Sequence, residues 1–395
     1  MTHVPDATLL ESAHALLEPA VGLRRQIHAH PELGLDLPHT QQLVLQALKG
    51  LRLEVSTGSA VTSVVAVLEG GRPGPTTLLR ADMDALPMPE GTGLPYSSEI
   101  EGAMHACGHD AHVAMLAGAA TLLAEHRESL AGRVVLMFQP GEEGHGGARV
   151  MLDEGLLERF GPVDRAFAIH ITPIFPSGSI NTKPGAMLAS ADEFRLVVSG
   201  RGGHASMPHH AIDPLPVACE IVTSLQSMVT RRVPIFDPAV LTVAHIAGGT
   251  TFNVIPEEVT MEGTVRALSP ESRELVLGRL REVAERVAAA HMCRAELSSV
   301  LTSYPVTLND HTEVARALRV AGSILGAAQA VEMSYPIMGA EDWSYVLQRV
   351  PGCMVFLGAA PPGVDEPAPN HSNRMVLDEA AMATGIAMYA AMALG

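Results

Sequence analysis

Apolar positions in the first half of the chain recur alternately with helical and with strand spacing. Helical spacing predicts helices at residues 8–30 and 39–49, and short apolar runs predict strands at 61–68 and 76–80. The alternation continues with a helix at 110–127, a strand at 133–139, a helix at 147–155 and a strand at 164–170. Strands that alternate with helices are typical of an α/β domain with a mostly parallel sheet and helices on both faces.

The pattern changes after KPGAM at residues 183–187. The next segments predict strands at 193–201, 239–249 and 258–268 and helices at 212–230 and 270–292. Two helices beside an antiparallel sheet make an α+β unit. From about residue 301 the first style returns, with a helix at 311–326, a strand at 355–358 and a helix from about 377. We therefore expect an α/β domain made of residues 1–185 and 301–395, interrupted by an inserted α+β domain at residues 186–300.

Composition and charge narrow the class of protein. Apolar residues make up 47% of the chain and charged residues 17%, which is typical of a globular protein. The net charge of −17 disfavours nucleic acid and anionic membranes as partners. The most apolar segments, 111–124 and 380–394, are shorter than a membrane span and are interpreted as buried helices. The N-terminus does not resemble a signal peptide, and four scattered cysteines indicate no disulfide framework, so a cytoplasmic location is expected.

Six residues with metal-binding side chains follow predicted strands or stand in loops: Cys107, His109, Glu142, Glu143, His170 and His371. A thiolate, imidazoles and carboxylates together suit Zn, Mn, Co or Ni better than Mg or Ca. Cys107 and His109 are two residues apart, so they point the same way in an extended loop. A helix that begins near Asp110 would help to deprotonate Cys107 through its positive end.

The segment QPGEEGHGG at residues 139–147 follows a strongly apolar strand. Adjacent glutamates cannot point in one direction in an extended segment, so one can bind a metal while the other acts as a general base. Taken singly, a buried Cys or His is more often a packing residue, and a Glu-Glu pair is more often solvated. Several strand-end loops that each carry metal-binding residues favour a metal site.

Eight motifs occur in this order: RADMDALP (80–87), HACGHDAH (105–112), QPGEEG, GRGGHAS (200–206), GGTTFNVIP (248–256), GTVRAL (263–268), GAEDWSY (339–345) and NHS (370–372). Together they resemble the di-metal amidohydrolases of the aminoacylase and carboxypeptidase group. The branch that matches best contains hippurate hydrolases, N-acyl-amino-acid amidohydrolases and auxin-conjugate hydrolases, and RRQIHAHPELG (24–34) fits its N-terminal signature.

This resemblance implies a centre of two divalent metal ions, drawn from Zn, Mn, Co or Ni. Cys107 would bridge the metals, and the remaining ligands would be His109, Glu143, His170 and His371. Glu142 would be the general base, and Asp82 matches the aspartate near the centre. Arg80 stands where the wider family has a ligand histidine, for which His109 would substitute. Asp110 is expected to cap the following helix or to orient His109, whereas His105 and His112 are not assigned as ligands.

The resemblance also implies that the inserted domain is a lid or dimerisation domain. His204 would stabilise the oxyanion, often from the partner subunit. The resemblance also implies a homodimer formed through this domain. Asn253, Arg266 and backbone amides near Gly339 would hold the substrate carboxylate. From the residues alone, His204 is a turn residue and Arg266 a surface charge. Trp343, where the family usually has Phe or Tyr, is interpreted as a core residue.

The resulting hypothesis is an enzyme that hydrolyses the amide bond of an N-acyl-L-amino acid. Within enzymes, the same centre could serve a dipeptidase, a carboxypeptidase or an N-acetyl-diaminopimelate deacetylase. From another class, a non-catalytic metal-binding protein is the alternative. The Glu142–Glu143 pair argues against it, because a protein that only binds metal needs no general base.

Overall fold

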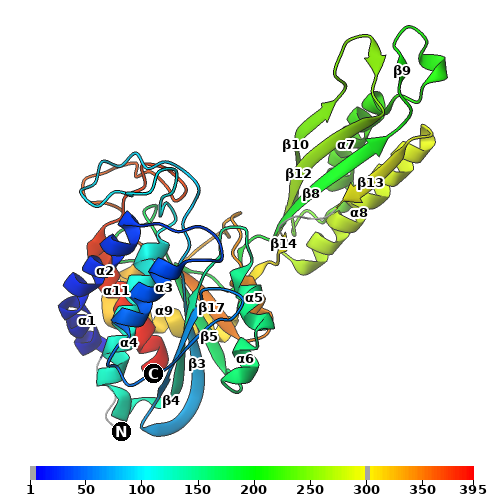
Figure 1. Cartoon of the computed structure of the whole chain (residues 1–395). Helices are drawn as coiled ribbons and strands as arrows, with labels where there is room; N and C mark the ends of the chain where they lie inside the picture. Colours follow the sequence, from blue (N-terminus) through cyan, green and yellow to red (C-terminus); the bar gives the residue numbers. More distant parts are fainter. Residues whose placement is uncertain (1–5, 299–302) are drawn as a thin grey trace. The chain divides into compact units, whose positions relative to one another are not determined.

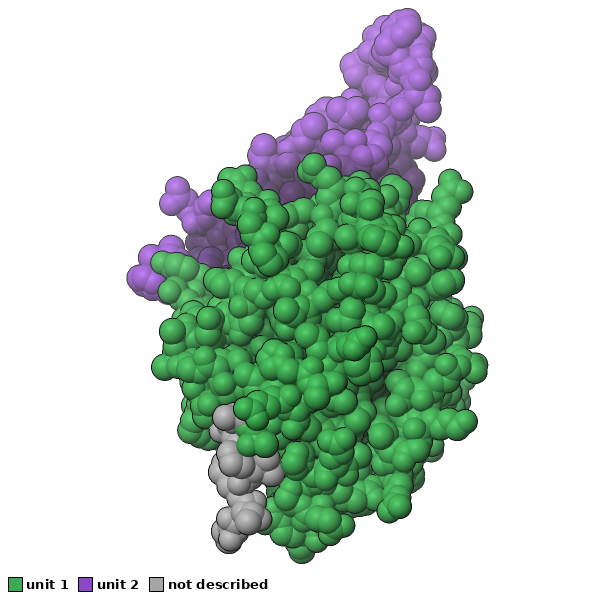
Figure 2. Space-filling view, turned by 90° about the vertical axis from the view of Figure 1, so that its left-hand side faces the viewer, with its two compact units in different colours: residues 1–187, 308–335, 342–395 green, residues 188–307, 336–341 purple. Residues whose placement is uncertain are grey.

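The computed structural model describes residues 6–298 and 303–395, which form two compact units (Figure 1). Unit 1 takes the chain up to residue 187 together with residues 308–335 and 342–395. Unit 2 takes the described part of residues 188–307 together with residues 336–341. Figure 2 distinguishes the two units by colour.

Unit 1 is built on an eight-stranded mixed sheet with the order β1-β2-β4-β3-β5-β17-β6-β16. The four central strands β4, β3, β5 and β17 run parallel, whereas β1 and β2, β2 and β4, and β17 and β6 pair in antiparallel fashion. The strands are β1 (Glu54–Thr57), β2 (Val64–Glu69), β3 (Arg72–Asp82), β4 (Ala131–Gln139), β5 (Arg165–Thr172), β6 (Ile180–Thr182), β16 (Ala330–Glu332) and β17 (Gly352–Gly358). The parallel arrangement predicted from the sequence is therefore found in the middle of the sheet.

The antiparallel direction of β2 follows from its link to β3. Only Gly70 and Gly71 separate the two strands. A connection of two residues reverses the chain and is too short for the crossover that parallel strands need. Because β3 is parallel to β4, a β2 that runs opposite to β3 must also run opposite to β4.

Helices cover both faces of this sheet, with α4, α9 and α11 on one side and α5 and α6 on the other (Figure 1). The helices of unit 1 are α1 (Asp6–Ala15), α2 (Leu17–Ala29), α3 (Pro38–Ala47), α4 (His109–Glu125), α5 (Gly147–Asp153), α6 (Leu156–Arg159), α9 (His311–Leu325), α10 (Ser344–Leu347) and α11 (Met382–Leu394). The helix expected at residues 8–30 is two helices. Pro19 lacks an N–H and its ring clashes with the carbonyl four residues earlier, which belongs to Ala15, the last residue of α1.

The two most apolar segments form buried helices, as their composition predicts. Nearly every residue of α11 is buried, and α4 is buried along most of its length. Trp343 is also fully buried, which agrees with its interpretation as a core residue. Among the described residues, none of the helices combines the length and the apolar content needed to cross a bilayer.

Unit 2 is an antiparallel sheet with the order β10-β12-β8-β13, with β14 also paired to β8, and it carries two long helices. Burial alternates strictly along β12, because one face of the sheet packs against the helices. Its elements are α7 (Pro214–Arg232), α8 (Pro270–Ala290), β8 (Ala191–Ser199), β10 (Ala239–Gly248), β12 (Glu258–Ala267), β13 (Arg294–Ser298) and β14 (Ser303–Tyr304). Unit 2 also contains the pair of β9 (Gly203–His204) with β11 (Val254–Ile255). A further pair, β7 (Gly185–Leu188) with β15 (Thr307–Asn309), belongs mostly to unit 1.

Candidate metal centre

The metal-binding residues of unit 1 gather at the carboxyl ends of the parallel strands. Asp82 ends β3 opposite Gln139, which ends β4, and His170 lies near the end of β5 opposite Phe356 on β17. Parallel strands end at one edge of a sheet, so the loops that follow them meet there. The sequence indicated this convergence, and the strand register bears it out.

Cys107 belongs to two groups of metal-binding side chains. Its Sγ lies 3.4 Å from His170 Nε2, and the ligand atoms of Cys107, His109 and His170 are all within 4.8 Å of one another. The ligand atoms of Cys107, Glu143 and His371 form a second such group, in which His371 Nε2 lies 3.2 Å from Glu143 Oε1. The thiol is therefore the donor that the two groups share.

Both histidines of the first group have one ring nitrogen held by a backbone carbonyl. His109 Nδ1 is 2.8 Å from the carbonyl oxygen of Asp84, and His170 Nδ1 is 2.9 Å from that of Ile171. A carbonyl only accepts, so each Nδ1 carries a proton and Nε2 is the ring nitrogen that a cation would bind. His109 Nε2 is buried without a hydrogen-bond partner among the described residues. This arrangement, with imidazole lone pairs beside a thiol and a carboxylate, fits a divalent cation.

His371 completes the second group from an unusual backbone conformation. Its φ of 67° lies in the left-handed region, which residues other than glycine rarely adopt. Its backbone N–H donates to the carbonyl of Ala106, the residue before Cys107, over 2.8 Å. Hydrogen bonds to Cys107 and to Glu143 raise the pKa of His371 to about 10. A cation that binds this imidazole therefore displaces a proton.

The environment of Cys107 differs from the one expected at a helix N-terminus. Burial, followed by the nearby carboxylate of Glu143, raises the pKa of the thiol. The start of α4 was expected to lower it, and desolvation outweighs that effect. Gly108, between Cys107 and His109, has a φ of 87°, and a Cβ there would lie 2.6 Å from a methyl carbon of Ile171. Only glycine fits at this position.

Comparison with known proteins identifies the family. Residues 78–395 match the sequence profile of peptidase family M20/M25/M40. The chain belongs to this family. It is 41% identical over 376 residues to the IAA-amino acid hydrolase ILR1-like 4 of Arabidopsis thaliana, with 94% of this chain and 84% of the relative covered. It is 36% identical over 375 residues to the N-acetylcysteine deacetylase of Bacillus subtilis, with 95% and 96% covered.

A solved structure of the same family gives a similar picture. The Bacillus subtilis YXEP protein, described as a dinuclear metal binding peptidase, shares 33% identity and a TM-score of 0.83, with 96% of this chain and 98% of that chain covered. The M20/M25/M40 chain described here is accordingly a metal-dependent hydrolase of amide bonds, and its cofactor is a pair of divalent metal ions.

Asp82 is a close neighbour of His109. Its Oδ2 is 2.8 Å from the Arg80 guanidinium and 3.4 Å from His109 Nε2, and its Oδ1 is 2.5 Å from His112 Nδ1. Burial opposes ionisation, but the cationic neighbours, Arg80 first, hold the pKa of Asp82 well below its usual range. Arg80 also donates to Gln139 and to Asp342, so its guanidinium is bound to these polar groups and not to the shared thiol.

Asp110 has a different environment from the one expected. No side-chain capping bond is found at the start of α4, and among the described residues the Asp110 carboxylate makes no hydrogen bond to His109. Its Oδ2 instead accepts from Arg24 Nε at 3.0 Å and from His28 Nδ1 at 2.8 Å. The N-terminal RRQIHAHPELG segment is thereby attached to the loop that carries Cys107 and His109.

Two residues in the loop after β3 show what the sequence reasoning missed. The second aspartate of RADMDALP, Asp84, accepts from the backbone N–H groups of both Glu142 and Glu143. Its spacing of two residues from Asp82 on an extended segment was the available signal. The unassigned His105 is buried, and burial lowers its pKa to about 3, so it is neutral at pH 7.

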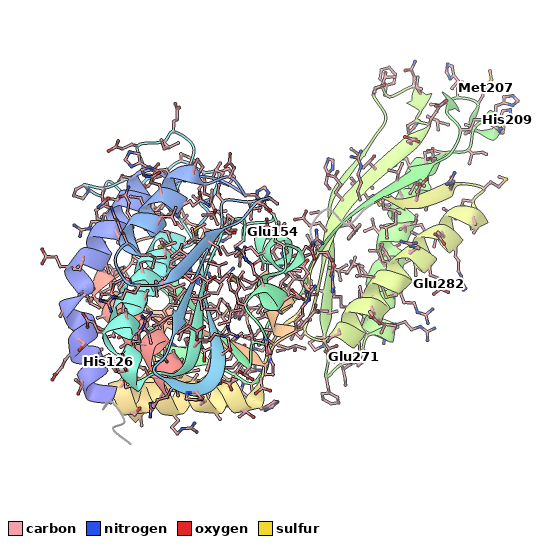
Figure 3. The ribbon with its side chains drawn as sticks, turned by 60° about the horizontal axis from the view of Figure 1, so that its bottom comes forward. His126, Glu154, Met207, His209, Glu271 and Glu282 are labelled. Atoms are coloured by element: carbon pink, nitrogen blue, oxygen red, sulfur yellow. The ribbon has the colours of Figure 1, made fainter. Side chains whose placement is uncertain are left out.

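The expected substrate-binding residues and His204 lie at separate places within unit 2, which also takes in Gly339 of the segment expected in the catalytic domain. His204 on β9 pairs with Val254 on β11, and Asn253 accepts from the N–H of Ala205, so His204 and Asn253 are neighbours. Arg266 lies near the C-terminal end of β12, about 23 Å along the strand from Val259 near its start. Gly339 is exposed in the segment 336–341. Met207 and His209, labelled in Figure 3, follow His204 in the turn after β9.

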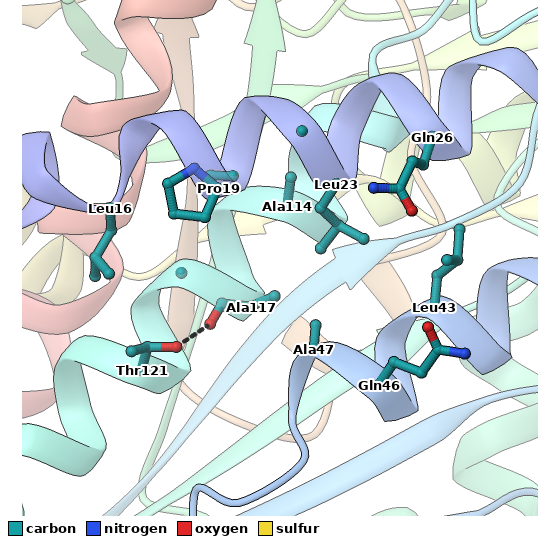
Figure 4. A pocket seen from close by; sticks show the side chains of 13 residues that line it. Leu16, Pro19, Leu23, Gln26, Leu43, Gln46, Ala47, Ala114, Ala117 and Thr121 are labelled. Atoms are coloured by element: carbon teal, nitrogen blue, oxygen red, sulfur yellow. Dashed lines mark hydrogen bonds between the residues drawn. The ribbon is translucent and has the colours of Figure 1, made fainter.

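A hollow between α2, α3 and α4 in unit 1 has a volume of about 510 Å³ (Figure 4). Leu16, Leu23 and Leu43 contribute apolar walls, and Gln26 and Gln46 provide polar groups. None of the residues that line it is a histidine, cysteine or acid, so it lacks the donors found around Cys107.

Proposed function

We propose that the chain hydrolyses the amide bond of N-acyl-L-amino acids. The observation that carries the proposal is the Glu142–Glu143 pair. Glu143 shares a group of ligand atoms with Cys107 and His371, and a carboxylate oxygen of Glu142 lies within 4.8 Å of the ligand atoms of Glu143 and His109. A ligand next to a buried carboxylate is the pairing that metal-assisted hydrolysis requires.

We assign the ligands by the two groups around Cys107. His109 and His170 would hold one cation, Glu143 and His371 would hold the other, and Cys107 would contribute to both. A bound pair of divalent cations supplies a lowered pKa for the attacking water and polarisation of the substrate carbonyl. Asp82 stays outside the ligand set, since Arg80 and His112 engage its two oxygens.

Glu142 is the proposed general base. Its carboxylate receives a proton from the water that attacks the amide carbonyl, and it then delivers this proton to the leaving amine. The backbone N–H of Glu142 donates to Asp84 over 2.9 Å, and this hydrogen bond keeps the Glu142 side chain beside the metal-binding residues. Substrate positioning is assigned to Asn253, Arg266 and amides near Gly339, and stabilisation of the oxyanion to His204. Arg266 provides a local positive charge for the substrate carboxylate in a chain whose net charge is −17.

We further propose that the enzyme acts as a homodimer through the inserted domain, residues 186–300, which also forms a lid over the domain made of residues 1–185 and 301–395. Val254, which pairs with His204, precedes β12, whereas Arg266 lies near the far end of that strand, so His204 and Arg266 of one chain are too far apart to contact one small substrate. A partner that supplies His204 removes this difficulty. Exposed apolar side chains beside His204 (Met207, Phe252 and Val254) support an interface there. A cytoplasmic location is proposed because the four cysteines are free.

A panel of substrates with added Mn or Zn tests the function. It contains hippurate, N-acetyl-methionine, N-acetyl-diaminopimelate and a dipeptide with a free α-amino group, each scored by kcat/KM. We expect the highest values for N-acyl-amino acids. A preference for the dipeptide would replace the proposal with a peptidase, and a preference for N-acetyl-diaminopimelate would narrow it to that deacetylase. Metal binding without turnover of any substrate would indicate a non-catalytic protein.

A further inference from the structure

We propose that Asp84 is a positioning residue that orients the general base and two metal ligands at once. Its Oδ1 accepts from the N–H of Glu142 at 2.9 Å, and its Oδ2 accepts from the N–H of Glu143 at 3.0 Å. Its backbone carbonyl accepts from His109 Nδ1 at 2.8 Å. One residue, 1% exposed, thereby reaches three residues of the site on two other loops.

The glutamate pair needs such support because it lies outside regular secondary structure. The segment between β4 and α5 has no ladder partner, and Gly141 and Gly144 on either side adopt φ values of 73° and 83°. Two successive N–H groups bound to the two oxygens of one carboxylate have a defined orientation. That orientation determines which glutamate side chain faces the other metal-binding residues and which faces the substrate.

The contact with His109 acts through the proton on the ring. Because the Asp84 carbonyl can only accept, His109 must carry its proton on Nδ1 and present Nε2 as the donor to a cation. The segment that holds Asp84 is itself fixed, since Ala85 pairs with Leu33 and its N–H donates to Glu32 over 2.8 Å. Asp84 thus connects this fixed segment to the Glu142–Glu143 loop and to His109 at the start of α4.

The carboxylates of Asp82 and Asp84 contact different parts of the site. Asp82 contacts Arg80 and His112, which lie on β3 and α4, whereas the Asp84 carboxylate contacts the loop after β4. A purely structural Asp84 would contribute to the free energy of unfolding only. A positioning Asp84 also sets kcat and the affinity of the folded apoprotein for metal.

The substitution Asp84→Asn tests the proposal. Asparagine has the same shape but keeps one oxygen, so its NH₂ group must face one of the two backbone N–H groups. We expect kcat to fall roughly 10–100-fold and the Kd of the folded apoprotein for Mn or Zn to rise by a similar factor, the range seen for groups that support ligands. KM should change little. Asp84→Glu, which retains both oxygens, should recover part of the metal affinity.

Glu154→Gln is the matched control. Glu154, labelled in Figure 3, accepts from the successive N–H groups of Ser59 and Ala60, both at 2.7 Å, and it lies outside the proposed site. We expect this variant to retain kcat and metal Kd, whatever its change in stability, because its contacts lie away from the metal-binding residues. The proposal is overturned if folded Asp84→Asn has the kcat and metal Kd of the parent, or if its changes only match those of Glu154→Gln.

The inference rests on the roles proposed above for Glu142 and Glu143. The metal titration requires no substrate, so a wrong substrate class would leave its outcome unaffected. If Asp84→Asn does not fold, the same titration on Asp84→Glu decides: an unchanged Kd counts against the proposal, and a weakened Kd in a folded protein supports it.

Discussion

His112 donates from Nδ1 to Asp82 over 2.5 Å, while its Nε2 accepts the backbone N–H of Ile171 over 2.7 Å. Both ring nitrogens are therefore occupied by protein groups. His112 nevertheless lies in a group of potential metal ligands with Asp82 and His109, so proximity alone does not distinguish it from the ligands.

The first prediction follows from this relationship. His112→Gln should retain two metal ions per chain, because His112 has no free lone pair to offer a cation. It should lose about 1–3 kcal/mol of unfolding free energy, since buried groups on Asp82 and Ile171 lose their partner. His371→Ala, by contrast, should lose one metal ion. Elemental analysis of dialysed protein and denaturant unfolding measure these quantities, and loss of a metal equivalent from His112→Gln would contradict the assignment.

Glu142→Ala should bind metal normally and lose turnover by roughly 10²–10⁴-fold, the contribution typical of a general base. Glu143→Ala is the paired variant, and it should lose metal as well as activity because Glu143 belongs to a ligand group. Steady-state kinetics at saturating metal, with metal content measured in parallel, separates the two. Undiminished kcat in metal-replete Glu142→Ala would disprove the mechanism.

Cys107→Ala should reduce the affinity of both metal positions, because its Sγ belongs to both groups of ligands. His170→Ala should affect mainly one position. Peroxide should likewise release metal from the parent protein in parallel with loss of activity, since oxidation removes the thiolate donor. The test is metal content against time of peroxide treatment, and activity and metal content that both resist peroxide would argue against a thiolate ligand.

The free energy of unfolding should depend on pH through His28. Burial lowers its pKa, but Asp110 and Glu90 more than compensate and raise it to about 9 from 6.5. The folded protein then holds the His28 proton more tightly than the unfolded chain. The stabilisation, about 3 kcal/mol, is complete below pH 6.5 and is lost as the pH rises to 9. Groups that face His28 are Asp110, Glu90, Arg24, His105 and Tyr96.

Urea unfolding between pH 6 and pH 9.5 measures this slope. In His28→Gln, which cannot be protonated, the decline across this interval should flatten. His14, an exposed histidine on α1, provides the comparison, because His14→Gln should leave the slope of the parent unchanged. Equal slopes in His28→Gln and in the parent would show that other groups cause the dependence.

Much of the architecture could be predicted because local patterns record it. The alternation of helix and strand, the apolar composition of α4 and α11, and the convergence of strand ends all depend on periodicity and burial. The break between α1 and α2 also has a local cause in Pro19. The antiparallel strand β2 was missed because strand direction depends on pairing with distant residues and not on its own pattern.

The sequence by itself determined the family and predicted the metal-binding residues and the general base, because these depend on residue type and on short spacings. Only the tertiary structure decided which donors share a group, why His112 is occupied, and where Asp110 and Asp84 direct their carboxylates. The reason is physical: hydrogen bonds and metal ligation act over a few ångströms between atoms that lie far apart in the sequence, 263 residues in the case of Asn370 and Cys107. No local pattern encodes those distances.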